Sequence, residues 1–163
     1  MAKDQQSIYV LVASCNAMAG GSLRLLLEDA QTVVNVCLSL RECETNVQKA
    51  KPDVLVIDAP YGSSITSGLE LAGKIRLKSP STSILILSTR EVKANSIAEQ
   101  LLLESVCFKR KDHLSGQELP LVVHRLAIAA KGYQNLRRSS WKPISLKSDN
   151  DHERRPTLPA KKP

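Results

Sequence analysis

Asp58 is the residue best placed to do chemistry, because it ends an unbroken apolar run. Val54–Ile57 precedes it, and Ala59, Pro60 and Gly62 follow it. A continuous β-branched and aliphatic run is typical of a strand that is buried on both faces of a parallel sheet. Open α/β sheets build their sites where the carboxyl ends of such strands meet. We therefore expect Asp58 at a site-forming edge of a sheet.

The cysteines and histidines do not form a second candidate site. Cys15, Cys37, Cys43 and Cys107 contain no C-x-x-C pair, and no Cys/His group has the spacing of a zinc site. We interpret the cysteines as small core residues of a reducing compartment. Cys15 has the alternative role of a redox thiol near a helix start. The two isolated histidines, His113 and His124, are not expected to be catalytic, and His124 is expected on the surface or at a partner contact.

Cofactor and nucleotide motifs are missing from the sequence. Gly20-Gly21 belongs to no G-x-G-x-x-G or Walker pattern. No base–nucleophile pair is evident in the sequence. We therefore expect no cofactor and no enzyme activity, with a flavodoxin-like enzyme as the alternative.

Length, composition and charge limit the class of protein. The 163 residues, 42% of them hydrophobic, predict one domain with a real core. There is neither an 18-residue apolar stretch nor a signal-peptide core near Met1, so we expect a cytoplasmic protein without a membrane contact. The net charge of +7 is uneven, because residues 131–163 carry nine basic and three acidic residues. A basic tail, rather than a basic domain, is predicted.

Strands and helices are predicted to alternate strictly along residues 7–132. Such alternation is typical of a parallel sheet covered by helices on both faces. The predicted class is an α/β, flavodoxin-like, doubly wound sheet of five parallel strands in the order 2-1-3-4-5, with five helices. The predicted strands are 8–13, 33–38, 54–58, 84–87 and 106–108, and the predicted helices are 23–30, 42–51, 69–78, 92–104 and 119–130.

Details of three helices also follow from the pattern. Ser22 is a plausible N-cap of the first helix, and Val47 and Ala50 are expected to face inward from the second. The last helix has the option of continuing to Arg138. The strand order places the crevice between the first and third strands, so Asp58 and the Ser14-Cys15 loop should face each other.

Both ends of the chain lie outside the predicted domain. Residues 1–6 are expected to be an N-terminal arm. Residues 133–163 contain Pro, Ser, Lys and Asp without any period, which predicts a basic, disordered tail. Trp141 within it is expected either to dock on the domain or to anchor a short motif.

Residues 7–130 resemble the receiver domain of bacterial response regulators. The stretch Pro52–Asp58 is similar to the third strand of that family, which ends in the phospho-accepting aspartate, and Gly68–Arg76 is similar to the helix that follows. Ser88, Phe108 and Lys111 fall at the positions of the switch hydroxyl, the switch aromatic and the lysine of a Lys-Asp pair. The resemblance implies a phosphoryl-accepting Asp58, with Lys111 and Ser88 contacting the phosphoryl oxygens.

The resemblance fails at the metal-binding half of the site. The family carries a pair of acids at the end of the first strand, whereas the matching positions here are Ala13, Ser14 and Cys15. Mg²⁺ prefers carboxylate oxygens, and one carboxylate would be its sole anionic ligand. We therefore predict a pseudo-receiver in which Lys111 and Asp58 form a salt bridge.

The predicted function is a receiver-like signalling module of a two-component or phosphorelay pathway, acting through protein–protein contacts. A kinase or an output protein is the expected partner. A face that the resemblance implies, made by the fourth helix, the fifth strand and the fifth helix with Leu101 and Phe108, is expected to carry the output or a homodimer. One alternative is a response regulator that is phosphorylated on Asp58. Another is a nucleic-acid-associated regulator that binds through the tail.

Overall fold

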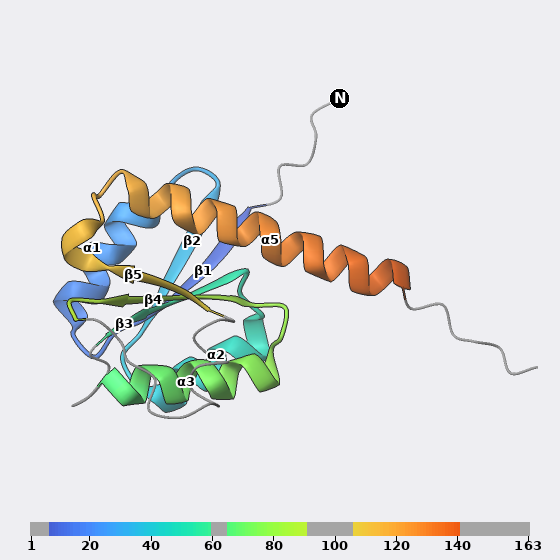
Figure 1. The fold of residues 1–163 in the computed structure, drawn as a ribbon, viewed down its shortest axis with the longest axis horizontal. Coiled ribbons are helices and arrows are strands. Elements are labelled where there is room, and N and C mark those ends of the chain that lie inside the picture. The colour runs from blue at the N-terminus through green and yellow to red at the C-terminus, as the bar shows by residue number, and fades with distance from the viewer. Residues whose placement is uncertain (1–6, 60–64, 91–105, 141–163) are drawn as a thin grey trace, which may run out of the picture.

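The computed structural model of the protein describes residues 7–59, 65–90 and 106–140, and these form one five-stranded parallel sheet (Figure 1). The strand order is β2-β1-β3-β4-β5, so the predicted order 2-1-3-4-5 and the predicted fold class are confirmed. The strands are β1 (Ile8–Ala13), β2 (Thr32–Cys37), β3 (Val54–Asp58), β4 (Ser83–Ser88) and β5 (Cys107–Arg110).

Four α-helices lie within the described residues, and a short 3₁₀ helix, η1, follows β5. The helices are α1 (Ala17–Leu27), α2 (Leu40–Ala50), α3 (Ile65–Lys78), η1 (Lys111–His113) and α5 (Glu118–Ser140). The fourth predicted helix, at 92–104, lies outside the described residues, as does Leu101.

The central strands are buried on both faces because their side chains alternate between two cores. Leu11, Leu55 and Ile84 are neighbours across β1, β3 and β4 and point into one core. Val12 and Val56, one position further along, point into the other core. The period of two along a strand produces this division, and it explains why the sequence of β3 is apolar without interruption.

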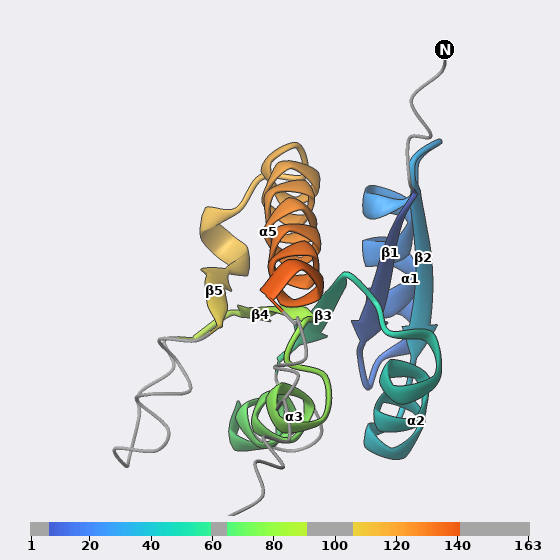
Figure 2. The ribbon, with the colours of Figure 1, turned by 90° about the vertical axis from the view of Figure 1, so that its right-hand side faces the viewer.

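The helices cover the sheet in two layers, α1 and α5 on one face and α2 and α3 on the other (Figure 2). Val47 of α2 and Ile75 of α3 are fully buried in one core, and Leu27 of α1 and Val123 of α5 are buried in the other. Ala50 is exposed at the end of α2, so the prediction that it faces inward is wrong. Ala50 is the last residue of α2, and Cys43 and Val47 are the residues through which this helix reaches the core.

The first helix begins six residues earlier than the sequence indicates. The side chain of Asn16 accepts hydrogen bonds from the backbone N–H of Met18 (2.9 Å) and Ala19 (3.1 Å), so Asn16 is the N-cap. Ser22 lies inside the helix, and its hydroxyl donates to the carbonyl of Met18. The Ser22 cap prediction is therefore wrong. Gly20 is buried within α1, where it allows a close approach of the helix to β2.

The last helix crosses the predicted end of the domain. α5 continues from Glu118 to Ser140, as the predicted option of a helix to Arg138 allowed, so residues 133–140 are helical and do not belong to a disordered tail. In Figure 1 its C-terminal part projects away from the sheet. The arm at 1–6 and residues 141–163, with Trp141, lie outside the described residues, and their predicted roles stay predictions. None of the helices of the described part is long and apolar enough to cross a bilayer.

Candidate functional site

Asp58 lies where the strand order reverses, at the carboxyl end of β3. It pairs in register with Leu87 of β4, and both residues adjoin the face that α1 and α5 cover. The residue is only 6% exposed. A carboxylate that is buried to this degree needs charged or hydrogen-bonding partners. The neighbouring segments supply one partner for each of its oxygens.

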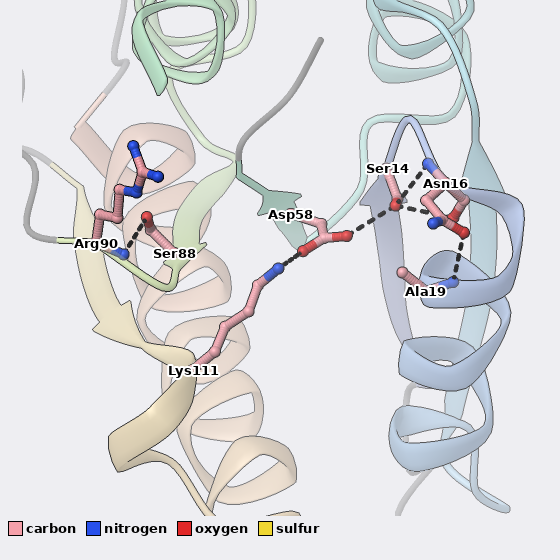
Figure 3. Close-up of polar contacts among 7 residues, drawn as sticks. All are labelled: Ser14, Asn16, Ala19, Asp58, Ser88, Arg90 and Lys111. Atoms are coloured by element: carbon pink, nitrogen blue, oxygen red, sulfur yellow. Dashed lines mark hydrogen bonds and ion pairs between the residues drawn. The ribbon is translucent and has the colours of Figure 1, made fainter. Parts of the chain in front are cut away.

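Ser14 is the partner on the β1 side. Its hydroxyl donates a 2.8 Å hydrogen bond to Oδ2 of Asp58, and Ser14 itself is fully buried (Figure 3). The Ser14 Oγ also contacts the carbonyl of Asn16 at 3.0 Å and accepts from the Asn16 N–H at 3.3 Å. One hydroxyl thus connects Asp58 to the residue that caps α1. The prediction that the Ser14 loop faces Asp58 is confirmed.

Lys111 is the partner on the β5 side. It is the first residue of η1, directly after β5, and its ammonium forms an ion pair with Oδ1 of Asp58. In Figure 3 the side chain extends from the end of β5 toward β3. Among the described residues this ammonium is the partner of Oδ1, which receives no hydrogen bond from a neutral donor. The predicted Asp58–Lys111 salt bridge is therefore present.

The donor set does not fit a resident Mg²⁺. In the described part of the chain, no group of three His, Cys, Asp or Glu side chains comes close enough to hold a metal ion. Ala13 and Ser14 are neutral, and a hydroxyl and an ammonium already contact the two oxygens of Asp58. Mg²⁺ needs oxygen ligands at short distance, and an ammonium beside the same carboxylate opposes it.

Ser88 ends β4, and Phe108 is the second residue of β5, where it pairs with Ile86; both make contacts other than with Asp58. The Ser88 hydroxyl is fully buried and accepts a 3.1 Å hydrogen bond from the backbone N–H of Arg90, as Figure 3 shows. Phe108 is half-buried on β5, where it packs against the core on the α2–α3 face. The structure therefore brings together Asp58, Lys111 and Ser14 of the predicted site, whereas Ser88 binds Arg90 and Phe108 packs against the core on the other face of the sheet.

The four cysteines, which were further candidates for chemistry, differ in burial. Cys37 and Cys43 are fully buried, and contact with the Cys37 thiol, together with burial, raises the pKa of Cys43. Cys107 is half-buried, and burial raises its pKa as well. Cys15 is exposed, so the interpretation of all four cysteines as core residues is wrong for this one.

His124 is half-buried on α5, and its ring binds to the start of β2. Its Nε2 lies 3.2 Å from the hydroxyl of Thr32 and 3.7 Å from a carboxylate oxygen of Asp29.

Two features of the site were not predicted from the sequence. They are the role of Asn16 as the N-cap of α1 and the hydrogen bond from Ser14 to Asp58. The Asn at the end of an apolar strand was the available signal for the cap.

Comparison with solved structures supports the fold, whereas comparison of the sequence with known families assigns no family. No protein-family model and no curated protein matches the sequence. The CheY-like receiver domain from Methanospirillum hungatei JF-1 is similar in structure, with a TM-score of 0.64 and 12% identity over 78% of this chain and 99% of that one. A Francisella response regulator receiver domain has a TM-score of 0.62 and 22% identity over 75% and 98%.

A longer protein contains the same fold. NtrX from Brucella abortus, solved in complex with ATP, has a TM-score of 0.65 and 16% identity over 81% of this chain. The match covers 29% of NtrX, so the chain spans less than a third of that protein. These likenesses establish that the described residues have the fold of a receiver domain.

Proposed function

We propose that the protein is a receiver-like signalling module that acts by protein–protein contact, in which a standing Lys111–Asp58–Ser14 network replaces Mg²⁺-dependent phosphorylation. The observation that carries this proposal is the state of Asp58. Both of its oxygens are engaged by side chains of the chain itself, and the residue is nearly buried. A phosphoryl acceptor instead needs an accessible carboxylate and a divalent cation beside it.

The physical argument concerns the charge that develops during phosphoryl transfer. In receiver-type chemistry, acids near the acceptor hold the cation that neutralises the phosphoryl oxygens. Here Ser14 supplies one neutral hydroxyl in that region, and Lys111 is the nearby cation. Lys111 alone leaves most of the developing charge without compensation, so we expect transfer to Asp58 to be slow.

The surface of β5 and α5 is the proposed docking face. Lys109 is exposed on β5, and Leu121 and Arg125 are exposed on α5, where they line a hollow together with Phe108. Leu121 is 61% exposed, and an apolar side chain that lies beside basic ones suits a partner with an acidic rim and an apolar centre. A kinase or an output protein of a two-component pathway is the proposed class of partner.

The phosphorylation half of the proposal is tested with a small phosphodonor. The protein is incubated with acetyl phosphate and Mg²⁺, and the intact mass is followed beside an ordinary receiver domain as positive control. We expect the control to gain one phosphoryl group and this protein to remain unmodified. A stoichiometric gain that Asp58→Asn abolishes would show instead an ordinary phosphorylated response regulator.

The docking half is tested by comparing two surface variants as baits. Leu121→Glu changes the proposed face, whereas Leu77→Glu changes an equally apolar and 86% exposed position on α3. We expect a two-component partner to bind the wild type and Leu77→Glu but not Leu121→Glu. Equal retention by both variants would remove β5 and α5 from the interface.

A further inference from the structure

A groove runs from the Asp58–Lys111 pair along the space between α1 and the start of α5. Its volume is about 290 Å³, close to the lower limit for small-molecule sites. Among the residues that the structure describes, the walls are mostly aliphatic. The lining consists of Ala19, Ser22, Leu23 and Leu26 of α1, Leu87 of β4, and Leu114, Ser115, Gly116 and Leu119 before and within α5, with Asp58 and Lys111 at one end.

The groove is not strongly acidic where Asp58 lines it, because a cation lines it at the same place. Asp58 is the one acidic residue among the described residues of the lining, and the Lys111 ammonium is paired with it. Ser14 beyond it is neutral, so within the described residues Asp58 is the carboxylate that an incoming anion would meet there. An ammonium carries three N–H donors, and the Lys111 side chain is 32% exposed. Its remaining donors can therefore serve an anion that enters from the groove.

The wall on the α1 side is apolar where a surface helix usually is polar. Leu26 lines the groove and is 49% exposed, and Leu23 beside it is half-buried. The hydroxyls of Ser22 and Ser115 are the neutral polar groups of the lining. A ligand with an aliphatic body and a single anionic head matches both the apolar walls and the Lys111 ammonium.

We infer that this groove binds a small aliphatic carboxylate, with the tail between α1 and α5 and the carboxylate beside Lys111. The inference rests on the proposed function, because both require that the Lys111–Asp58 ion pair is always present in the site. The bound tail would contact α1 and the segment before α5 at once. The ligand would therefore stabilise the relative position of the two elements that flank Asp58.

Octanoate, below its micelle-forming concentration, is the probe for the full-length protein. Binding is measured by calorimetry or by chemical-shift changes. Octanol and octylamine are the comparison ligands, because they have the same aliphatic tail but a neutral or a cationic head group. We expect octanoate to bind at least about tenfold more tightly than octanol, as one charge-assisted hydrogen bond implies. Octylamine should bind more weakly than octanol, because Lys111 repels it.

Two variants test the position of the ligand. Ser22→Phe fills the groove from an exposed position on α1, and Lys111→Gln removes the cation. We expect each to weaken octanoate binding about tenfold or more, while octanol should lose affinity only in Ser22→Phe. Leu25→Ala is the control, because Leu25 is exposed on the same helix and does not line the groove.

Three results would overturn the inference. They are the lack of octanoate binding at millimolar concentration, equal affinities of octanoate and octanol, and full binding by Ser22→Phe. The acetyl phosphate experiment has a separate readout. A protein that binds octanoate and also becomes phosphorylated on Asp58 would refute the proposed function and leave the groove assignment intact.

Discussion

Ser14 and Asp58, 44 positions apart in the chain, share a buried hydrogen bond of 2.8 Å between the hydroxyl and Oδ2. The bond joins the ends of β1 and β3 at the point where the strand order reverses. A neutral donor therefore lies where the resemblance to receiver domains would place an acid. The same hydroxyl contacts Asn16, so the carboxylate, the loop and the start of α1 form one connected network.

Ser14→Asp should place an acid where receiver domains have one, and the two neighbouring carboxylates should then require a bound cation. Two carboxylates would lie side by side near Lys111, so we expect a loss of about 1–3 kcal/mol in the free energy of unfolding without divalent ions. Mg²⁺ should restore much of this loss and should permit modification of Asp58 by acetyl phosphate. Thermal unfolding with and without Mg²⁺ measures the effect.

The control for this variant is Ser14→Ala, which removes the donor but adds no charge. It should be destabilised and should not respond to Mg²⁺. A wild-type protein whose melting temperature rises with Mg²⁺ as strongly as that of Ser14→Asp would contradict the neutral-site interpretation.

Lys111→Met should leave Asp58 nearly buried without its cation. Breaking a fully buried pair costs about 3–5 kcal/mol, and the 32% exposure of Lys111 reduces this to about 1–3 kcal/mol. Asp58→Asn in the same chain should recover most of the loss, because the charge that lacks a partner is then gone. A double-mutant cycle in urea measures the coupling between the two residues. Additive losses would mean that the ion pair contributes nothing.

Gly20 and Gly21 should respond in opposite directions to alanine. A Cβ at Gly20 would lie 2.7 Å from Cγ1 of Val36 and 3.3 Å from Cβ of Ser14, so Gly20→Ala should cost about 1–3 kcal/mol. A Cβ at Gly21 meets nothing within 4 Å, so Gly21→Ala should stabilise the helix by about 0.5–1 kcal/mol.

A second substitution separates the clash from other effects at Gly20. Val36→Ala removes the methyl group that a Cβ would meet, so it should recover part of the stability of Gly20→Ala. Urea denaturation of the four proteins provides the comparison. If Val36→Ala only adds its own loss, the close approach of α1 to β2 is not the reason for the glycine.

Glu44 should make stability depend on pH in the acid range. It connects α2 to α3 through Lys78, 2.7 Å from Oε2, and Lys74, 3.5 Å from Oε1. The hydrogen bond from Lys78 is the main cause that lowers its pKa below the ordinary value of 4.5. The stabilisation is therefore complete above that value and is lost as the pH falls through the lowered pKa.

Glu44→Gln should lower the free energy of unfolding by about 0.5 kcal/mol near neutral pH, since the pair lies close to solvent. The difference from the wild type should shrink in acid and in molar salt. Urea midpoints across this pH range test the sign. A difference that persists at low pH would assign the effect to packing rather than to charge.

Much of the fold was predictable because each strand carries its own local pattern. The apolar runs predict β1 and β3 with the observed bounds, and the polar segments between them predict the helices that return to the sheet. Asp58 was predictable as a rim residue for the same reason. The start of α1 was not, because both Asn16 and Ser22 are good caps, and only the packing of Gly20 against Val36 shows that the helix already includes the glycines.

The sequence by itself determined the alternating elements and the place of Asp58 at the end of a strand, since the hydrophobic period acts locally along the chain. The order of the strands was predictable because a chain with this alternation commonly forms a doubly wound sheet with right-handed crossovers. The tertiary structure decided the partners of that carboxylate. Ser14 and Lys111 lie far from Asp58 in sequence, and a hydroxyl becomes a donor to a particular oxygen only after two strands pair in register. The groove beside them likewise exists only when α1 and α5 pack on the same face of the sheet.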